Sequence, residues 1–502
     1  MPSQSHRSPS RMWRGMPWGV KATIQLLSIL FVCMVDAAAL EDSDGVVSLY
    51  RTIEEGTDCD FAGTMVIGNF FSLGPDDKFF ALGSGQRTAF NIMIDHINRH
   101  KCGVRLDGLD GNYAIELRTY DDLGSTDGSS AVAYKLANDS SVDVLTAGYS
   151  STLTQPYVEI AHNESDKLVL APGAASTKVF LDKPLAFGML PPTQKYLLQA
   201  VKALATISGA KTMATVWEDA SFTRGVCAAA PGLAEQYGMT MTSMTEVVNT
   251  PNVTVLEPIA ATLQAENPDV VITCVYDCAP WVRAMRKVGW SPKAQVFTVC
   301  VGQEKFSNEI GTDTAYLMGV TPWDASLQIE DAVTGWTPSE FASLYRTVLG
   351  EEETADVAYQ SAMAGALISV LYQAVEAVGS FQDNGPELAE YISNNSFETM
   401  GGNFSFDENG QSMAPSLMVQ YDAEQLVHTI YPLETASGPI LYPMPSWDHR
   451  DCTLLSTCEQ QADNITDYLP MGNVCNDEGI CVCVRVSFRW VSKLRTEKTP
   501  TT

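Results

Sequence analysis

Two short segments of small and polar residues have the composition of ligand-binding turns. Gly148-Tyr-Ser-Ser151 directly follows the apolar residues 142–147, and Pro172-Gly-Ala-Ala-Ser176 directly follows the apolar residues 168–171. Small residues let a ligand approach the backbone, and N–H groups and hydroxyls in such turns can hold an anion. The two segments therefore indicate one half of a small-molecule binding site. The alternatives are ordinary strand-to-helix turns that carry no ligand, or helix capping by the two serines.

The elements around these turns alternate between strand patterns and helix patterns. Apolar runs predict strands at residues 65–71, 113–120, 142–147 and 168–171. Amphipathic spacing predicts helices between them, near residues 89–97, 130–137 and 157–162. This alternation is typical of a parallel sheet with helices on both faces. Both turns then fall at the carboxyl ends of strands, where open parallel sheets bind their ligands.

The same alternation restarts after Pro191-Pro192-Thr193, which we interpret as a crossing between two lobes. The strands expected in the second half lie at residues 212–217, 239–247, 269–276, 295–301 and 316–320. A turn is expected at residues 220–225, with a helix only from residue 226. A second crossing, at residues 321–323, leads to a long apolar helix, 358–378, and to a hairpin with an Asn-Gly turn, 402–410.

The predicted fold class is α/β, with two doubly wound lobes joined by more than one crossing. Within a binding domain of residues 60–432, lobe 1 is expected to comprise about residues 60–190 and 323–380, and lobe 2 about residues 191–322 and 396–432. Lobes connected in this way commonly close around a ligand by hinge motion. A cysteine-rich segment, residues 450–484, and a basic tail, residues 485–502, follow.

The first 39 residues have the pattern of a secretory signal peptide. Basic residues precede an apolar run at residues 22–35, and Ala37-Ala38-Ala39 supplies the small residues of a cleavage site. A signal anchor is the alternative, although the run is short for a membrane span. No other stretch has the apolarity of a transmembrane helix, so we expect a protein that is secreted or displayed on the extracellular face of the plasma membrane. In a secreted eukaryotic chain, six sequons would be candidate glycosylation sites, at Asn138, Asn163, Asn252, Asn394, Asn403 and Asn464.

The charge balance excludes nucleic acid as a partner. The chain has 60 acidic and 31 basic residues and a formal net charge of −29. So acidic a chain offers no basic stripe that could neutralise phosphates, and it also repels anionic membranes.

The 12 cysteines indicate an oxidising compartment. Cys33 lies within the signal peptide, and we expect Cys59 to pair with Cys102, because these two bracket the first strand and helix. The middle group should form two bridges whose connectivity is open, among Cys227, Cys274, Cys278 and Cys300. The last group has an odd number, which leaves one cysteine unpaired within this sequence, among Cys452, Cys458, Cys475, Cys481 and Cys483.

The order and spacing of several motifs resemble the type 1 periplasmic-binding-protein fold over about residues 60–430. This family contains the leucine/isoleucine/valine-binding proteins, and the ligand-binding regions of animal amino-acid and natriuretic-peptide receptors are similar to it. Besides the two turns, the resemblance rests on Met65-Val-Ile-Gly, Thr154-Gln-Pro156, Asn267-Pro-Asp-Val-Val-Ile272 and Gly402-Asn-Phe-Ser-Phe-Asp-Glu-Asn-Gly410. It implies two lobes that close around an amino-acid-like ligand.

The resemblance also implies roles for particular residues. In the amino-acid binders of this family, the serine that matches Ser151 holds the ligand carboxylate through its hydroxyl and its N–H. Backbone groups that match Gly173 and Ala175 hold the carboxylate and the ammonium, and an aromatic that matches Phe222 covers the ligand. Asp277 is our candidate for the acid that meets the ammonium, with Glu218 and Asp219 as alternatives. The expected ligand-binding residues are Ser150, Ser151, Gly173, Ala174, Ala175, Ser176, Phe222 and Asp277.

We expect a binding or sensing protein and not an enzyme. The sequence has no G-x-x-x-x-G-K-[ST], H-E-x-x-H or G-x-S-x-G motif, and we expect no cofactor and no metal site. Ala175 stands where the amino-acid binders carry a hydroxyl, so the ligand is expected to be an amino acid or a related carboxylate.

The resemblance implies a receptor ectodomain that dimerises through lobe 1. The alternatives are a soluble secreted carrier and a secreted α/β enzyme that uses Asp277 or Asp121 in the cleft. Asp121-Asp122 directly follows an expected strand, and for this pair the composition predicts a solvated turn.

Overall fold

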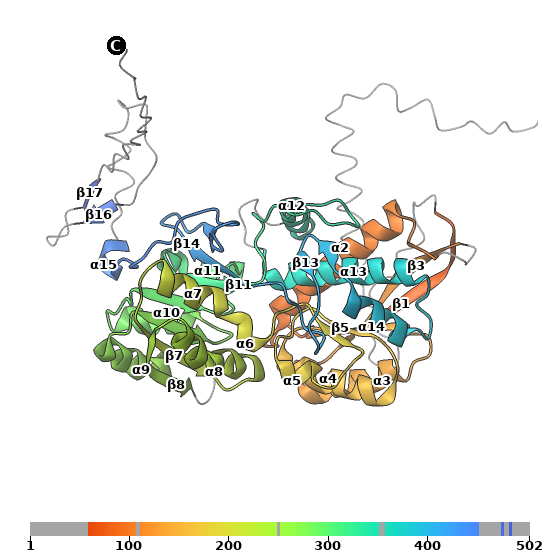
Figure 1. The fold of residues 1–502 in the computed structure, drawn as a ribbon, viewed down its shortest axis with the longest axis horizontal. Helices are drawn as coiled ribbons and strands as arrows, with labels where there is room; N and C mark the ends of the chain where they lie inside the picture. The colour runs from red at the N-terminus through yellow and green to blue at the C-terminus, as the bar shows by residue number, and fades with distance from the viewer. Residues whose placement is uncertain are drawn as a thin grey trace, which may run out of the picture. The chain divides into compact units, whose positions relative to one another are not determined.

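The computed structural model of the protein describes residues 59–106, 111–247, 252–350 and 357–450, and the backbone of two short strands, β16 (Asn473–Cys475) and β17 (Cys481–Cys483) (Figure 1). The chain divides into two compact units. Unit 1 comprises residues 1–192 and 325–414, and unit 2 comprises residues 193–324 and 415–502. The signal peptide, most of the cysteine-rich segment and the basic tail lie outside the described residues.

Unit 1 contains a six-stranded sheet of the order β2-β3-β1-β4-β5-β6. All neighbours are parallel except β2, which runs antiparallel to β3. The short central strands β4 and β5 are entirely buried, in keeping with their mostly apolar sequences. The strands are β1 (Phe61–Phe71), β2 (Val104–Arg105), β3 (Asn112–Asp121), β4 (Val144–Thr146), β5 (Val169–Ala171) and β6 (Ala186–Gly188).

The helices of unit 1 are α2 (Phe80–His100), α3 (Thr126–Ala137), α4 (Ser151–Glu164), α5 (Thr177–Phe180), α12 (Pro338–Leu349), α13 (Tyr359–Val378) and α14 (Gly385–Asn394). Helix α13 packs along α2. By length and composition α13 could cross a membrane, so the expectation that no stretch beyond the N-terminus has this character was wrong. However, 78% of its apolar window is buried inside the structure, as in the core helix of a globular unit.

Unit 2 contains a seven-stranded sheet of the order β15-β14-β11-β10-β9-β7-β8. The strands are parallel except at one edge, where β14 is antiparallel to both β11 and β15. They are β7 (Thr212–Glu218), β8 (Thr240–Val247), β9 (Val270–Cys274), β10 (Ala294–Phe297), β11 (Met318–Thr321), β14 (Leu417–Tyr421) and β15 (Val427–Tyr431). The helical segments are α6 (Thr193–Tyr196), α7 (Leu198–Thr206), α8 (Ser221–Gln236), α9 (Val253–Glu266), α10 (Ala279–Lys287), α11 (Glu304–Ile310), η1 (Gly311–Thr314) and α15 (Trp447–Arg450).

The segment that was expected to open the last part of lobe 2 belongs instead to unit 1. Residues 396–414 fall within unit 1, because the backbone of this segment pairs with β6. Gly188 donates its N–H to the Gly410 carbonyl at 2.8 Å, and its own carbonyl accepts the Ser412 N–H at 2.9 Å. Gln411 adds a side-chain bond, in which its Nε2 donates to the Ala175 carbonyl at 3.0 Å.

Two local predictions differ from the structure in their bounds. The hairpin expected at residues 402–410 is shifted, because β13 (Gly402–Phe404) pairs with the preceding strand β12 (Phe397–Thr399). The predicted Asn-Gly turn is present in a short hairpin of its own, in which Phe406 bridges Ser412, the Asp407 N–H donates to the Gln411 carbonyl at 2.8 Å and the Met413 N–H donates to the Ser405 carbonyl at 2.9 Å. Helix α8 begins at Ser221, so the residues expected to form a turn at 220–225 are the first turns of this helix.

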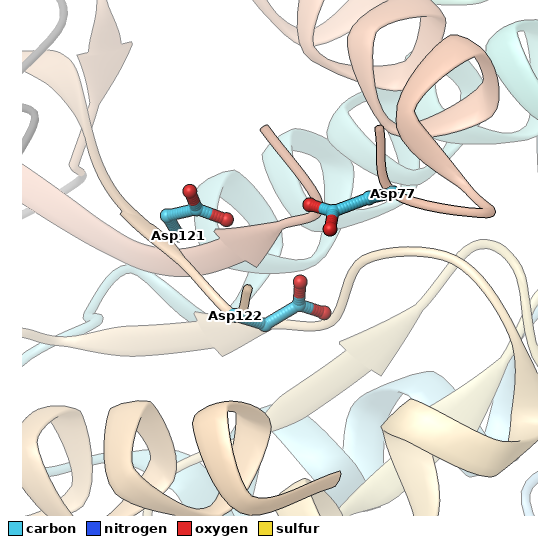
Figure 2. A group of neighbouring side chains, drawn as sticks. All are labelled: Asp77, Asp121 and Asp122. Atoms are coloured by element: carbon cyan, nitrogen blue, oxygen red, sulfur yellow. The ribbon is translucent and has the colours of Figure 1, made fainter. Parts of the chain in front are cut away.

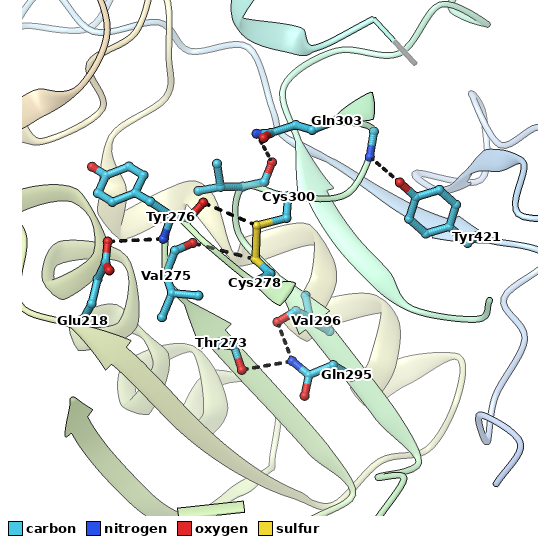
Figure 3. The surroundings of a disulfide bond; sticks show 12 residues. Glu218, Thr273, Val275, Tyr276, Cys278, Gln295, Val296, Cys300, Gln303 and Tyr421 are labelled. Carbon is cyan, nitrogen blue, oxygen red and sulfur yellow. Dashed lines mark hydrogen bonds between the residues drawn. A yellow bond between two sulfur atoms is a disulfide. The ribbon is translucent and has the colours of Figure 1, made fainter. Parts of the chain in front are cut away.

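The disulfide predictions for the described cysteines are confirmed. Cys59 pairs with Cys102, which ties the start of β1 to the chain after α2. The middle group of four cysteines forms two bridges, as expected, and the structure settles their connectivity as Cys227–Cys274 and Cys278–Cys300. The first bridge joins α8 to β9, and the second joins the start of α10 to the chain after β10 (Figure 3).

The carboxylate of Asp143, just before β4, predicts a pH dependence of stability. Its Oδ2 accepts the Val66 N–H at 2.7 Å, and burial, the largest cause, raises the pKa of Asp143 to about 6. The folded chain therefore binds this proton more tightly than the unfolded chain does. Stability that is present below the unfolded pKa, about 4, is lost as pH rises through about 6.

Replacing Asp143→Asn should remove this dependence while keeping an oxygen for the Val66 N–H. We expect the variant to be as stable as the wild type at about pH 4. At about pH 7 it should be more stable by on the order of 1 kcal/mol, because it has no buried charge there; the gain is small because solvent screens a partly exposed carboxylate. Urea denaturation at both pH values measures the difference. An equal difference at the two pH values would contradict the assignment.

Candidate functional site

The two turns expected from the sequence lie at the carboxyl edge of the unit 1 sheet and contact each other. Tyr149 and Gly173 form a parallel bridge beyond the pairing of β4 with β5. The Ser151 Oγ accepts hydrogen bonds from the N–H groups of Ala175 and Ser176, each at 3.1 Å. The structure therefore brings the predicted residues of unit 1 together in one buried place.

Ser150 is the N-cap of α4, so the capping alternative describes this residue. Its Oγ accepts the Leu153 N–H at 3.3 Å, and its φ of 91° is rare for a residue with a side chain. Strained backbone of this kind gathers at functional sites, because the surrounding structure must hold it there. Ser151, in contrast, directs its hydroxyl to the second turn and not to the end of its own helix.

The Ser151 hydroxyl has a proton that its two accepted hydrogen bonds do not use. Two N–H groups already occupy its oxygen, so the hydroxyl proton remains to be donated elsewhere. Each bond that the oxygen accepts polarises the hydroxyl and strengthens it as a donor. Ser151 is also the first residue of the 14-residue helix α4, and the first N–H groups of a helix lack partners within the helix. The position therefore favours a negative group.

The backbone at Gly173 leaves no room for a side chain. A Cβ there would lie 2.7 Å from Cδ2 of Tyr149 and 3.0 Å from Nε2 of Gln86. Gln86, on α2, is completely buried, and neither of its amide atoms has a hydrogen-bond partner. An unpaired buried amide costs free energy, so it marks a place where the interior is polar and not fully satisfied. Sequence reasoning missed Gln86, although its position among apolar residues of α2 was visible.

In unit 2, Phe222 lies within an aromatic cluster. Its ring packs edge to face on Tyr196 at 5.1 Å and lies 6.0 Å from the ring of Tyr276. The acid beside this cluster is Glu218, which is 5% exposed and whose Oε1 accepts the Tyr276 N–H at 3.2 Å (Figure 3). Asp277, the acid chosen from the sequence, is exposed. Of the acids considered for unit 2, Glu218 is therefore the one that is buried beside the aromatic cluster.

Comparison with known proteins identifies the class. The family described as "Periplasmic binding protein" matches residues 74–425, which is more than half of the chain. The chain therefore belongs to this family, and the resemblance seen in the sequence is confirmed.

Solved structures agree with this assignment. The branched-chain amino acid transporter substrate-binding protein LivJ from Streptococcus pneumoniae, in complex with isoleucine, aligns with a TM-score of 0.59 at 16% identity, over 72% of this chain and 96% of that one. The leucine-binding protein LivK from Thermotoga maritima aligns with a TM-score of 0.60 at 15% identity, over 72% and 97%. A solute-binding protein from Rhodopseudomonas palustris, in complex with 3,4-dihydroxybenzoic acid, aligns with a TM-score of 0.59 at 15% identity, over 74% and 94%. At such identity these likenesses show the fold, and they confirm the predicted α/β class with two sheets.

Proposed function

We propose that this chain is an extracytoplasmic binding protein whose small-molecule ligand carries a carboxylate. The observation that carries the proposal is the Ser151 hydroxyl, which two backbone N–H groups of the second turn hold in place at the start of α4. A carboxylate accepts such charge-assisted hydrogen bonds strongly. The other half of the site is proposed to come from Phe222 and Glu218 of unit 2, with the lobes closing around the ligand as the family resemblance implies.

The ligand is proposed to be an amino acid or a related carboxylate, such as an aromatic acid. Ala175 has no hydroxyl to offer an ammonium, whereas the aromatic cluster around Phe222 suits an apolar or aromatic ligand body. Among the solved relatives, one holds isoleucine and another holds 3,4-dihydroxybenzoic acid.

Two of the three solved structures are described as binding proteins of transporters, which supports a soluble carrier. A receptor ectodomain, dimerising through lobe 1, is the second candidate, and it rests on the family resemblance alone.

Thermal unfolding with a panel of ligands tests the proposal. The panel contains leucine, isoleucine, benzoate and 3,4-dihydroxybenzoate, with matched alcohols that lack the carboxylate. A ligand at about 100 times its Kd should add about 2.7 kcal/mol of stability, whereas its alcohol should add none. Recovery of the ligand unchanged distinguishes binding from turnover. A panel without any response, or a response to the alcohols alone, would count against a carboxylate ligand.

Ser151→Ala should weaken binding of the responding carboxylate by about tenfold to a hundredfold, because a hydrogen bond to a charged group contributes about 1.5–3 kcal/mol. Ser151→Thr keeps the hydroxyl and should retain most of the affinity. Ser130→Ala, which removes a hydroxyl that bonds only within α3, is the matched control and should bind normally. Isothermal titration calorimetry gives the three constants. Equal affinities in all three variants would show that the ligand does not contact Ser151.

A further inference from the structure

Three carboxylates converge at the carboxyl edge of the unit 1 sheet, apart from the two ligand turns. Asp121 is the last residue of β3 and Asp122 follows it, while Asp77 lies in the segment between β1 and α2. Figure 2 shows the side chain of Asp122 pointing toward Asp77, with Asp121 beside them. One oxygen of each carboxylate can be chosen so that all three lie within 4.8 Å of one another. In the sheet, β1 separates this cluster from β4 and its ligand turn.

Backbone N–H groups hold one oxygen of each carboxylate. The Asp77 Oδ2 accepts the Gly74 N–H at 3.0 Å. The Asp122 Oδ1 accepts the Gly124 N–H at 2.9 Å. The Asp121 Oδ1 accepts two N–H groups, from Leu73 at 3.1 Å and Leu123 at 2.9 Å. The carboxylates are therefore oriented by the backbone and not by cationic side chains.

The turn after β3 is shaped to bring its two aspartates against Asp77. Gly124 has a φ of 61°, and a Cβ on it would lie 2.7 Å from Oδ1 of Asp77. Leu123, which precedes it, also has a positive φ, of 53°, and is 70% exposed. An exposed leucine in this conformation is an unfavourable local choice. The unfavourable backbone conformation at residues 123 and 124 therefore accompanies the placement of Asp121 and Asp122 beside Asp77.

Besides the convergence of the three carboxylates, the burial of Asp122 points to a ligand. It is completely buried, so the expectation of a solvated turn was wrong for this residue. Its Oδ2 has no hydrogen-bond partner and its side chain is directed into the cluster (Figure 2). A buried carboxylate beside two others is costly unless a cation accompanies it.

We propose that Asp77, Asp121 and Asp122 form a calcium site that joins the segment after β1 to the turn after β3. Ca²⁺ takes six to eight oxygen ligands at about 2.3–2.6 Å, so oxygens on opposite sides of one ion lie about 4.8 Å apart. Three oxygens that all lie within 4.8 Å of one another can therefore surround one ion. Water completes the coordination. The irregular set of ligands suits calcium, since magnesium demands near-ideal octahedral geometry at about 2.0–2.1 Å.

Thermal unfolding of the EDTA-treated full chain in rising CaCl₂, at constant ionic strength, tests the site. We expect a saturable rise of the Tm by about 2–6 °C by about 10 mM, with a midpoint in the range of about 0.1–1 mM that extracellular calcium modules show. MgCl₂ should give a clearly smaller rise. No saturable response, or an equal response to magnesium, would overturn the assignment to calcium.

Neighbouring aspartates supply a matched pair of variants. Asp77→Asn should lose the calcium response but remain folded, since its oxygen can still accept the Gly74 N–H. Without calcium it should be as stable as the wild type or more so, because it removes one of three like charges. Asp76→Asn removes an exposed charge outside the cluster and should keep the full response. An equal calcium response in both variants would show that the ion merely screens the acidic surface, and would refute the site.

Discussion

Replacing Gly173 by valine is expected to abolish the stabilisation that a carboxylate ligand gives to the protein. The new side chain would begin 2.7 Å from the Tyr149 ring, 3.0 Å from the Gln86 amide and 3.1 Å from the Tyr149 Cα. Because the Tyr149 backbone belongs to the same turn as Ser151, relief of this clash must displace the turn that we propose holds the ligand. Overpacking of this kind costs about 1–3 kcal/mol.

The control for this substitution is Gly232→Val. Gly232 lies in the exposed face of α8, and a Cβ there meets nothing within 4 Å. Helix propensity then changes stability by only a few tenths of a kcal/mol, roughly in favour of valine. Urea denaturation and calorimetric titration of both variants separate the effects. Normal ligand affinity in Gly173→Val would show that the second turn does not shape the site.

The elements of both sheets could largely be predicted, because parallel strands are buried on both faces and therefore have continuous apolar sequences. The runs at residues 65–71 and 269–276 correspond to β1 and β9 in this way. The return of residues 396–414 to unit 1 could not be predicted. It depends on bonds such as the one from Gln411 to Ala175, two residues that are 236 positions apart. No local pattern encodes such a pairing.

Only part of the candidate site could be predicted, again because local patterns do not encode contacts between distant segments. Ser151 and Gly173 were found because a small polar turn after a buried strand is a local signal. Asp122 and Gln86 were missed because composition alone places an aspartate in a solvated turn and a glutamine on a helix surface. Both are fully buried, and only the packing of distant segments makes them so. Glu218 and Asp277 show the converse, since both acids lie near the carboxyl ends of buried strands, β7 and β9, yet Glu218 is buried and Asp277 is exposed.

Removing the Cys227–Cys274 bridge is expected to cost unit 2 about 4 kcal/mol of stability. The bridge spans 47 residues, and both sulfurs are completely buried between α8 and β9. A cross-link over a loop of this length restricts the unfolded chain by about that amount. The double variant Cys227→Ala with Cys274→Ala keeps the core apolar. Urea denaturation followed by tryptophan fluorescence measures the loss, since Trp281 of unit 2 is fully buried and becomes exposed on unfolding.

The second bridge provides a comparison with a different expected outcome. Cys278–Cys300 spans only 22 residues, which predicts a smaller loss, of about 3 kcal/mol. However, Cys278 directly follows the segment that carries Tyr276, and the Cys300 sulfur lies 3.7 Å from the Tyr276 carbonyl (Figure 3). Its removal should therefore also lower ligand affinity, because Tyr276 contacts Phe222. If removal of either bridge lowered ligand affinity equally, the aromatic cluster would not be the part of unit 2 that meets the ligand.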